Sequence, residues 1–584
     1  MRGHVVLLSM SMASPCDLKV VLLCKGRGAD AASYRPNRDE SQWWSRRDAL
    51  VRCVTAFLFG PSTKDCKKEL VLLFDDDLAR IHMTVEEDSD VIPSEQAIVS
   101  LWKQAAQQLN KPLISRGLTC HIVMDPLLQQ DTASSASSSL PTGMDSKRHV
   151  LEYLQKKCAI DFLRSHGLNS SASVILRKTN KKALMDVWNE WRKLQKKRQP
   201  KGSTPDLASR IESIYFDLLP KSTEAVEAVA GTLHEKFEEL PCFGLHPTKH
   251  SSGSTRKIHL CLFLGAVRDM FPFEYEALNK ACDRSKIPMA GIRLGTVPEF
   301  TSKILSVLSF HHSQGVLAGA IERLVDPARS PDSTKPIVPP SCLHVVCAIP
   351  MPSSEVSTDL RDRNRIHWAL VRVIVCTLWR SKLMSSSASA SSHENSLNLV
   401  FEDGVVVALH ESEFVAALAE QHQAAPCEYQ ILTALKEKLA TASPPDGNWS
   451  KTLAIQAFQN ISIASSLPVT CTISIELDAP NSLAESFYSL ESSNQTRDHA
   501  IIIVLDILAP SQQQDKARKI QDYFLRASHK ANIPVLRAAL VAGACQDREA
   551  STIIALQHFC YQSRMFASCQ HDPRSGKKRK KHSK

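Results

Sequence analysis

The stretch KIHLCLFLG (Lys257–Gly265) and the segment AGIRLG (Ala290–Gly295) that follows it decide the predicted fold. Each is a short apolar run that stops at a glycine, which is the pattern of a buried strand. A polar turn follows the second run and leads into a helix from about Lys303. Glycine lets a ligand approach the backbone closely, and ligands of open α/β sheets bind beyond the carboxyl ends of parallel strands. The stretch therefore predicts a binding site at one edge of a sheet.

Much of the chain recurs in the same order further along. LKVVLLC (Leu18–Cys24) matches LHVVCAI (Leu343–Ile349), and ELVLLF (Glu69–Phe74) matches SLNLVF (Ser396–Phe401). Five more pairs keep this order: RRDALVRCVTAFLFG with RIHWALVRVIVCTLW, the Pro-led helices Pro93–Leu109 and Pro426–Leu439, LTCHIVM with VTCTISI, Lys286-Ile287-Pro288 with Asn532-Ile533-Pro534, and KILSVLSF with TIIALQHF. Duplication explains seven ordered matches, so two tandem copies of one α/β domain are predicted.

The repeat sets the predicted domain boundaries. Copy one comprises residues 18–130 and 257–325, and copy two comprises residues 342–570. Helical patterns across residues 147–240 have no counterpart of that length in copy two, so they predict an inserted helical subdomain. Three further segments complete the division: a lead-in at 1–17, a proline-rich linker at 326–341, and a basic tail at 571–584.

Composition limits the class of protein. No apolar run approaches the ~20 residues that cross a bilayer, so no membrane contact is expected. The 17 cysteines are scattered singly and form no C-x-x-C pair. This predicts reduced core thiols in a cytosolic or nuclear protein, and no zinc site. The acidic turn Asp75–Asp77 fits either Mg²⁺ or a solvated turn, and we expect no metal.

The charge is concentrated at one end of the chain. The formal net charge is +10, and the tail after Pro573 carries much of it. The run KKRKK (Lys577–Lys581) is typical of a nuclear or nucleolar address, and equally of a solvated tail. A nuclear or nucleolar location is therefore expected, with the cytoplasm left open. The rest of the chain is only mildly basic, so contacts with RNA must come from local patches.

Two local patches are candidates for RNA contact. The first lies on the helix that begins at Arg46, and the second lies beside Trp188 and Trp191 in the predicted insert. Cations next to aromatic side chains suit an RNA backbone, but both patterns also fit helices with a solvated face. The candidate RNA-binding residues are Arg47, Arg52, Arg192, Lys196, Lys197 and Arg198.

The pattern strand–LGAVRD–helix–strand–RLG–polar turn–TSKILSVLSF resembles the carboxyl-terminal half of SPOUT-class, or α/β-knot, RNA methyltransferases. RRDALVRCVTAFLFG, ELVLLF and PSEQAIVSLWKQA are similar to the tRNA pseudouridine methyltransferase branch, and LGAVRD with RLG…SKIL resembles the tRNA guanine-methylating branch. The resemblance covers about 180 residues of copy one. It implies parallel sheets whose last strands and helix thread through a loop as a trefoil knot, which is rare among folds.

The resemblance also implies S-adenosylmethionine as cofactor, bound among three knot loops. Their backbone groups read the adenine while apolar side chains hold the ring. The first loop is at 264–266, the second at 291–295 and the third at 300–305. The implied cofactor-binding residues are Leu264, Gly265, Gly291, Leu294, Gly295, Thr301, Ser302, Ile304 and Leu305.

The resemblance implies the catalytic residues less directly than it implies the cofactor loops. An aspartate lies near the position of Asp269 in the guanine branch, so Asp269 is the candidate general base, with Arg268 beside it and Glu299 as a second acid. Asp269 also fits a helix cap ahead of Pro272, and Glu299 a solvated turn. The chain departs from the family pattern because no Gly-Pro-Glu-Gly run follows the first strand.

Copy two departs further from the pattern. Leu505-Asp506-Ile507 stands where Gly265 and its neighbours stand in copy one, and Leu540-Val541 stands in place of Leu294-Gly295. We therefore expect a single working site in copy one, with copy two as the other half of a pseudo-dimer in a monomeric chain. The alternative is a non-catalytic nucleolar RNA-binding or ribosome-assembly factor with the same fold. The substrate, either tRNA or rRNA, stays open.

Overall fold

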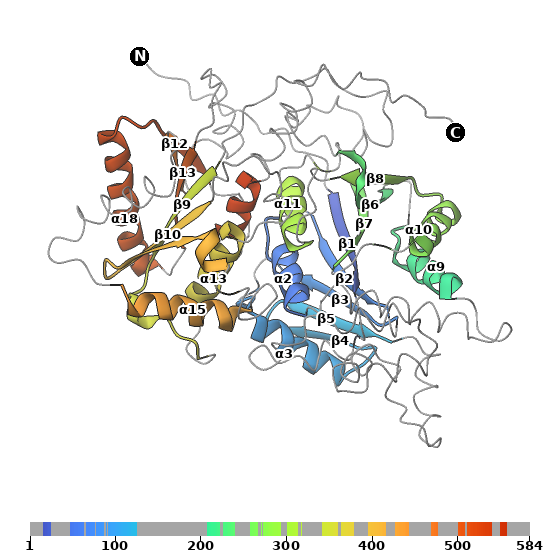
Figure 1. Ribbon diagram of the computed structural model, residues 1–584. Coiled ribbons are helices and arrows are strands. Elements are labelled where there is room, and N and C mark those ends of the chain that lie inside the picture. The colour runs from blue at the N-terminus through green and yellow to red at the C-terminus, as the bar shows by residue number, and fades with distance from the viewer. Residues whose placement is uncertain are drawn as a thin grey trace, which may run out of the picture.

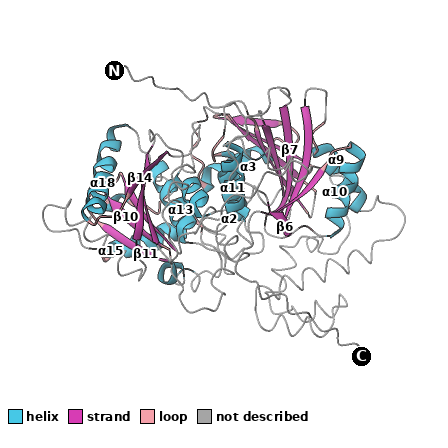
Figure 2. Cartoon of the chain, turned by 90° about the horizontal axis from the view of Figure 1, so that it is seen from above, coloured by secondary structure: helices cyan, strands magenta, loops and turns pink. Residues whose placement is uncertain are grey.

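The computed structural model contains two α/β units side by side, each built on one sheet (Figure 1). Helices α2 (Arg47–Leu58), α11 (Thr301–Ser313) and α13 (Arg365–Leu378) lie between the two sheets (Figures 1 and 2). The structure describes residues 16–24, 28, 47–62, 66–75, 78–86, 89, 91–124, 207–221, 226–239, 257–266, 270, 272–293, 301–313, 317, 342–359, 364–378, 395–415, 418, 427–442, 469–476, 500–507, 511–539 and 549–557.

The first sheet has eight strands and is mixed. Its five parallel strands lie next to one another, and three antiparallel strands extend one side. The order across the sheet is β4 (Pro112–Ser115), β5 (Leu118–Val123), β3 (Arg80–Val85), β2 (Lys68–Phe74), β1 (Cys16–Cys24), β7 (Lys257–Gly265), β6 (Val226–Glu239) and β8 (Met289–Arg293).

Helices cover both faces of the parallel part, which is why its strands are apolar throughout. On the inner face, α2, α11 and α3 (Glu95–Ala106) pack over a core that includes Leu22, Leu72 and Leu264. On the outer face, α9 (Leu207–Leu218) and α10 (Pro272–Ser285) pack over a second cluster that includes Phe263.

The second sheet has six strands, again mostly parallel. Helix α13 and α15 (Glu428–Ala440) pack in its inner core, and α18 (Ser511–Lys530) covers its outer face. A further helix spans residues 549–557. The strand order is β11 (Val406–His410), β10 (Ser396–Phe401), β9 (Cys342–Ile349), β13 (Ala500–Asp506), β12 (Val469–Glu476) and β14 (Val535–Ala539).

The two units share one topology. The order β3-β2-β1-β7-β6-β8 in the first has the same chain sequence and the same strand directions as β11-β10-β9-β13-β12-β14 in the second. Single hydrogen bonds repeat as well. Ala266 N donates to Leu23 O over 3.1 Å, and Ile507 N donates to Ala348 O over 3.0 Å. The two units therefore have the same topology, as two copies of one α/β domain would, and their origin by duplication stays a prediction.

The ends of two helices give an independent match. Lys286 after α10 and Asn532 after α18 both have a left-handed backbone, with φ of 54° and 55°. The carbonyl of Pro288 accepts from Ala230 N, just as that of Pro534 accepts from Thr472 N. This left-handed conformation is common where a helix ends. At both positions it directs the backbone from the helix into the next strand.

Part of the predicted insert belongs to the first sheet. The pattern at 223–239 predicts a helix, but residues 226–239 form β6, between β7 and β8. Small buried side chains such as Ala228 and Ala230 let the strand fit between layers, and this packing outweighs the helical propensity of its alanines and glutamates. Consequently VTCTISI (β12) corresponds to β6, and its predicted match with LTCHIVM, which contains β5, is wrong. The predicted helices at 147–166 and 181–199 lie outside the described residues.

The two units share a core. Val307 and Phe310 of α11 belong to the same buried cluster as residues of the second sheet and its helices. Lys303, also on α11, is 6% exposed, and its Nζ donates to Oε1 of Gln557 in the second unit over 3.4 Å. The trefoil knot depends on residues 294–300 and 240–256, which lie outside the described part, so it stays a prediction.

Candidate functional site

The predicted first cofactor loop lies where β7 ends. Leu264 is 3% exposed and pairs with Leu22 of β1, and Gly265 pairs with Leu23. Ala266 N continues this ladder by donating to Leu23 O. The side chain of Leu264 is thus part of the core, whereas the half-buried Gly265 adds only backbone to the carboxyl edge of the sheet.

One hydroxyl ties the third predicted loop to the first. Thr301 begins α11, and its Oγ1 lies 2.8 Å from the carbonyl oxygen of Gly265 and 3.0 Å from that of Ala266, so its proton is shared between these acceptors. The start of α11 is therefore fixed against the end of β7. Two segments that are 36 residues apart in sequence meet at the sheet edge.

Gly291, of the predicted second loop, lies on β8 and pairs with Thr232 of β6. Thr232 in turn pairs with Phe263 of β7, so one strand separates the first and second loops. Neighbouring strands are ~4.8 Å apart, which places the two loops ~10 Å apart across the sheet. The same edge also holds Met270, whose sulfur is 3.1 Å from Oγ1 of Thr232.

The other residues of the third loop divide between the edge and the core. Ser302 is half-buried, and its carbonyl accepts from Oγ of Ser306. Ile304 is partly buried against the inner core. Leu305 is fully buried, and its side chain packs in the core beneath α11. Only its backbone is left to contact a cofactor. The remaining predicted site residues, Arg268, Asp269, Leu294, Gly295, Glu299, Arg192, Lys196, Lys197 and Arg198, lie outside the described residues.

Arg47 and Arg52 do not lie on an open surface, and their predicted role in RNA contact stays a prediction. Arg47 is 4% exposed. The side chain of Arg52 is 11% exposed, and its guanidinium pairs with Asp48 over 2.7 Å. The pKa of Arg52 is raised by Asp48 and by Glu95, although burial opposes this shift. The sequence could not reveal this arrangement, because what covers α2 comes from distant segments of the chain.

Copy two has charged residues at the equivalent edge. Register places Asp506 opposite Ala348, as Gly265 lies opposite Leu23, and Asp506 is only 8% exposed. Glu549 at the start of the next helix is 2% exposed and pairs with Arg365 over 3.4 Å. Burial first, and then these two carboxylates, raise the pKa of Cys347 far above its usual range. A carboxylate therefore replaces the bare backbone that copy one presents.

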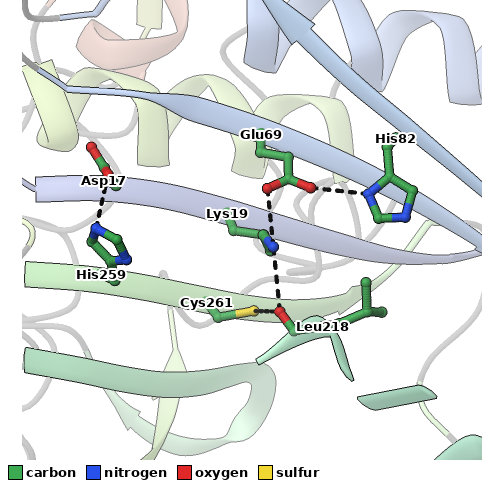
Figure 3. Close-up of polar contacts among 7 residues, drawn as sticks. All are labelled: Asp17, Lys19, Glu69, His82, Leu218, His259 and Cys261. Carbon is green, nitrogen blue, oxygen red and sulfur yellow. Dashed lines mark hydrogen bonds and ion pairs between the residues drawn. The ribbon is translucent and has the colours of Figure 1, made fainter. Parts of the chain in front are cut away.

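A second group of polar residues lies on the outer face of the first sheet, near the amino ends of its parallel strands (Figure 3). Lys19 on β1 pairs with Glu69 on β2 over 3.0 Å, and Glu69 also contacts His82 over 3.0 Å. Asp17 pairs with His259 over 2.9 Å. Lys19 Nζ also donates to Leu218 O at the end of α9 over 3.4 Å, a favourable place for a cation.

This group stabilises the sheet and shows no reactive residue. Hydrogen bonds from His82 and the charge of Lys19 lower the pKa of Glu69, against the opposing effect of burial. Burial raises the pKa of Cys261 to about 12, so its thiol stays protonated and is a poor nucleophile. Polar residues at alternate positions of otherwise apolar strands were the signal that could have revealed the group from sequence.

Comparison with known proteins adds no relative. No protein-family model matches the chain, and no curated protein matches its sequence. Within the described residues, no cluster of His, Cys, Asp and Glu could hold a metal ion. None of the described helices combines the length and the apolar character needed to cross a membrane.

Proposed function

We propose that this chain is an S-adenosylmethionine-dependent RNA methyltransferase of the SPOUT class, with one cofactor site at the carboxyl edge of β7 and β8 in copy one. Its substrate is a base of tRNA or rRNA, and its location is the nucleus or nucleolus. Two observations support the proposal. The first is the α/β topology that the two units share, and the second is the hydrogen bond that joins Thr301 to Gly265.

The path of the chain between β8 and α11 carries the proposal. Arg293 ends the edge strand β8, yet Thr301, eight residues later, is hydrogen-bonded to Gly265 on β7. In the order of the sheet β6 lies between β8 and β7, so the two ends of this connection lie on opposite sides of β6. The start of α11 beside the end of β7 supports a site in which the first and third loops meet at one edge.

The residues at this edge fit the cofactor. Gly265 and Gly291 contribute no side chain, so an adenine can approach the backbone closely at this edge, as in many nucleotide sites. S-adenosylmethionine supplies the methyl group when bound. Thr301 fixes the position of the first and third loops relative to each other, and Asp269 is the residue we propose to take a proton from the target base.

Copy two supports the site without sharing its chemistry. Buried Asp506 places a carboxylate where the cofactor would need bare backbone. This same feature favours the second candidate function, a non-catalytic RNA-binding or ribosome-assembly factor. Copy two retains the topology without a glycine at that position, so the fold alone does not require the cofactor.

Calorimetric titration of the full chain with S-adenosylmethionine tests the proposal. We expect one saturable site that Gly265→Val abolishes, because a branched side chain would occupy the edge. Thr301→Val, which keeps the shape and removes the hydroxyl, should weaken binding severalfold in a protein with unchanged circular dichroism. The matched control is Asp506→Asn, at the Gly265 position of copy two, which should bind as the wild type does. A pure protein that binds no cofactor would exclude the methyltransferase and leave the scaffold.

A further inference from the structure

Two cysteines of copy one lie side by side at the amino edge of the first sheet. The parallel register that pairs Leu18 of β1 with Lys68 of β2 places Cys16 opposite Cys66, two residues earlier in each segment. Neighbouring strands are ~4.8 Å apart, and the Cα atoms of a disulfide are roughly 4.4–6.8 Å apart. The two backbones therefore have the separation that a disulfide requires, and in the structure both thiols are reduced.

One hydrogen bond places the sulfur of Cys66 between the two strands. Leu18 N donates to Lys67 O over 2.8 Å, as in a regular parallel ladder. One step earlier in the ladder, Cys16 N donates to Sγ of Cys66 over 3.2 Å. The sulfur of Cys66 thus lies against the backbone of Cys16. A rotation about the Cα–Cβ bond of Cys16 is the movement that brings its own sulfur toward that of Cys66.

Neighbouring contacts hold the two residues in place. Asp17 Oδ1 accepts the backbone N–H of Lys67 over 3.0 Å, so the residues that follow the two cysteines are also joined. Nε2 of His312, near the end of α11, lies 2.7 Å from Cys16 O. A pair of residues held in this way loses little conformational freedom when a bond forms between them, which favours that bond.

The two thiols differ in exposure. Cys66 is half-buried and every other described cysteine is buried, so Cys66 is the described thiol that an oxidant in solution reaches first. Cys16 is 5% exposed, so it reacts with a group that the chain itself brings to it. Lys67 is exposed beside Cys66, and its charge favours the approach of an anionic oxidant such as glutathione disulfide.

We propose that Cys16 and Cys66 form a reversible disulfide, with glutathione disulfide as the oxidant. The thiolate of Cys66 attacks one sulfur of glutathione disulfide, so that a mixed disulfide forms and one glutathione leaves. Cys16 then loses its proton and attacks the sulfur of Cys66, and the second glutathione leaves. Two thiols are oxidised, and their two electrons and two protons pass to the two glutathione molecules that are released.

This disulfide is a redox-sensing site that does not depend on the function proposed above. Transient disulfides act as redox sensors in reducing compartments, so the site is compatible with the expected nuclear or cytosolic location. The two cysteines are 50 residues apart, and the loop between them contains α2. A crosslink across such a loop restricts the unfolded chain, so oxidation should raise the midpoint of thermal unfolding by on the order of 5 °C.

Peptide mapping of the full chain tests the proposal. The protein is incubated with an excess of glutathione disulfide, blocked with N-ethylmaleimide, digested without reduction and analysed by mass spectrometry. We expect a linked pair of peptides that joins Cys16 to Cys66 and that dithiothreitol separates. The matched control is Cys24→Ala, because Cys24 lies on the same strand opposite Phe74. This variant should form the linked pair as the wild type does.

Two further variants separate the roles of the two thiols. Cys66→Ser should leave Cys16 reduced, without bound glutathione, and the oxidant should no longer raise the thermal midpoint. Cys16→Ala should retain one glutathione on Cys66, because the thiol that expels it is gone. If Cys16→Ala does not fold, as circular dichroism would show, the wild-type map and Cys66→Ser decide the question. A wild type that retains glutathione on Cys66, or whose disulfides join only other cysteines, would overturn the proposal.

Discussion

The backbone N–H of Glu95 donates a hydrogen bond to a carboxylate oxygen of Glu428 over 3.1 Å, and each residue begins the equivalent helix of its copy. Two helix starts thus meet at the boundary between the copies. Glu95 is 3% exposed, and within the described part of the chain its Oε2 has no hydrogen-bond partner. Burial first, and then the charge of Glu428, raise the pKa of Glu95 well above its usual range, although Arg52 opposes this shift.

Glu95→Gln should therefore stabilise the protein at neutral and alkaline pH. The folded state binds the Glu95 proton more tightly than the unfolded chain does, so stability is complete below pH ~4.5 and falls as pH rises toward the folded pKa. Each unit of pKa elevation corresponds to ~1.4 kcal/mol, and we expect a gain on the order of 1 kcal/mol or more at pH 7.5. Urea unfolding at several pH values measures it. Glu413→Gln, an exposed residue paired with Lys438, is the control and should change little; an equal gain there would contradict the interpretation.

Buried histidines should make the protein sensitive to acid. Burial lowers the pKa of His311, of His312 and of His344 to about 4 in each case. For a histidine with a depressed folded pKa, stability is complete above pH ~6.5 and is lost as pH falls toward 4 and below. We expect the free energy of unfolding to decrease steeply over this interval, by up to ~3 kcal/mol for each such group.

One variant separates this effect from general acid instability. His344 is fully buried, and its Nδ1 lies 2.8 Å from Oγ of Ser396. His344→Asn should flatten the decline in stability between pH 6.5 and 4, even if it lowers stability at pH 7.5. His529→Asn, at an exposed position of α18, should leave the pH profile unchanged. Identical slopes in the wild type and in His344→Asn would show that protonation of His344 does not cause the loss of stability.

Lys68 should be one of the most sensitive single positions in copy one. Its buried ammonium donates to the carbonyls of Phe57, Gly60 and Pro61 over 2.6, 2.8 and 3.1 Å, where α2 ends. Lys68→Met keeps the length of the side chain but leaves these carbonyls without their donor, at a cost of roughly 2–4 kcal/mol. Lys67→Met, at the exposed neighbouring position, should cost less than ~0.5 kcal/mol. Denaturant midpoints compare the two, and similar shifts would count against a role for the buried ammonium.

Apolar periodicity predicted much of the fold because burial on both faces leaves a plain pattern. The runs at β1, β7 and β9 could be read as strands directly, and their repeat predicted the duplication. β6 could not be recognised, because its alanines and glutamates favour a helix and only packing between two strands makes it extended. Gly265 and Thr301 were both predicted site residues, but no local pattern shows the hydrogen bond that brings them together.

The same limit explains Arg47 and Arg52. A polar helix face that another part of the chain covers looks the same in sequence as one that faces solvent. Here α2 lies between the two sheets.

The last prediction concerns the boundary between the copies. Val307 and Phe310 project from α11 of copy one into the core of copy two, a surface that would otherwise be free to bind a second chain. We therefore expect a monomer by light scattering across a wide range of protein concentration. Phe310→Asp would place a charge in that core and should loosen the boundary, so that one cooperative unfolding transition separates into two. The control is Ile114→Asp, at an exposed position on β4, which should keep a single transition. A stable homodimer of the wild type would contradict the expected monomer. A single transition in Phe310→Asp with unchanged stability would contradict the shared core, because a charge buried in a core common to both copies cannot leave both halves unaffected.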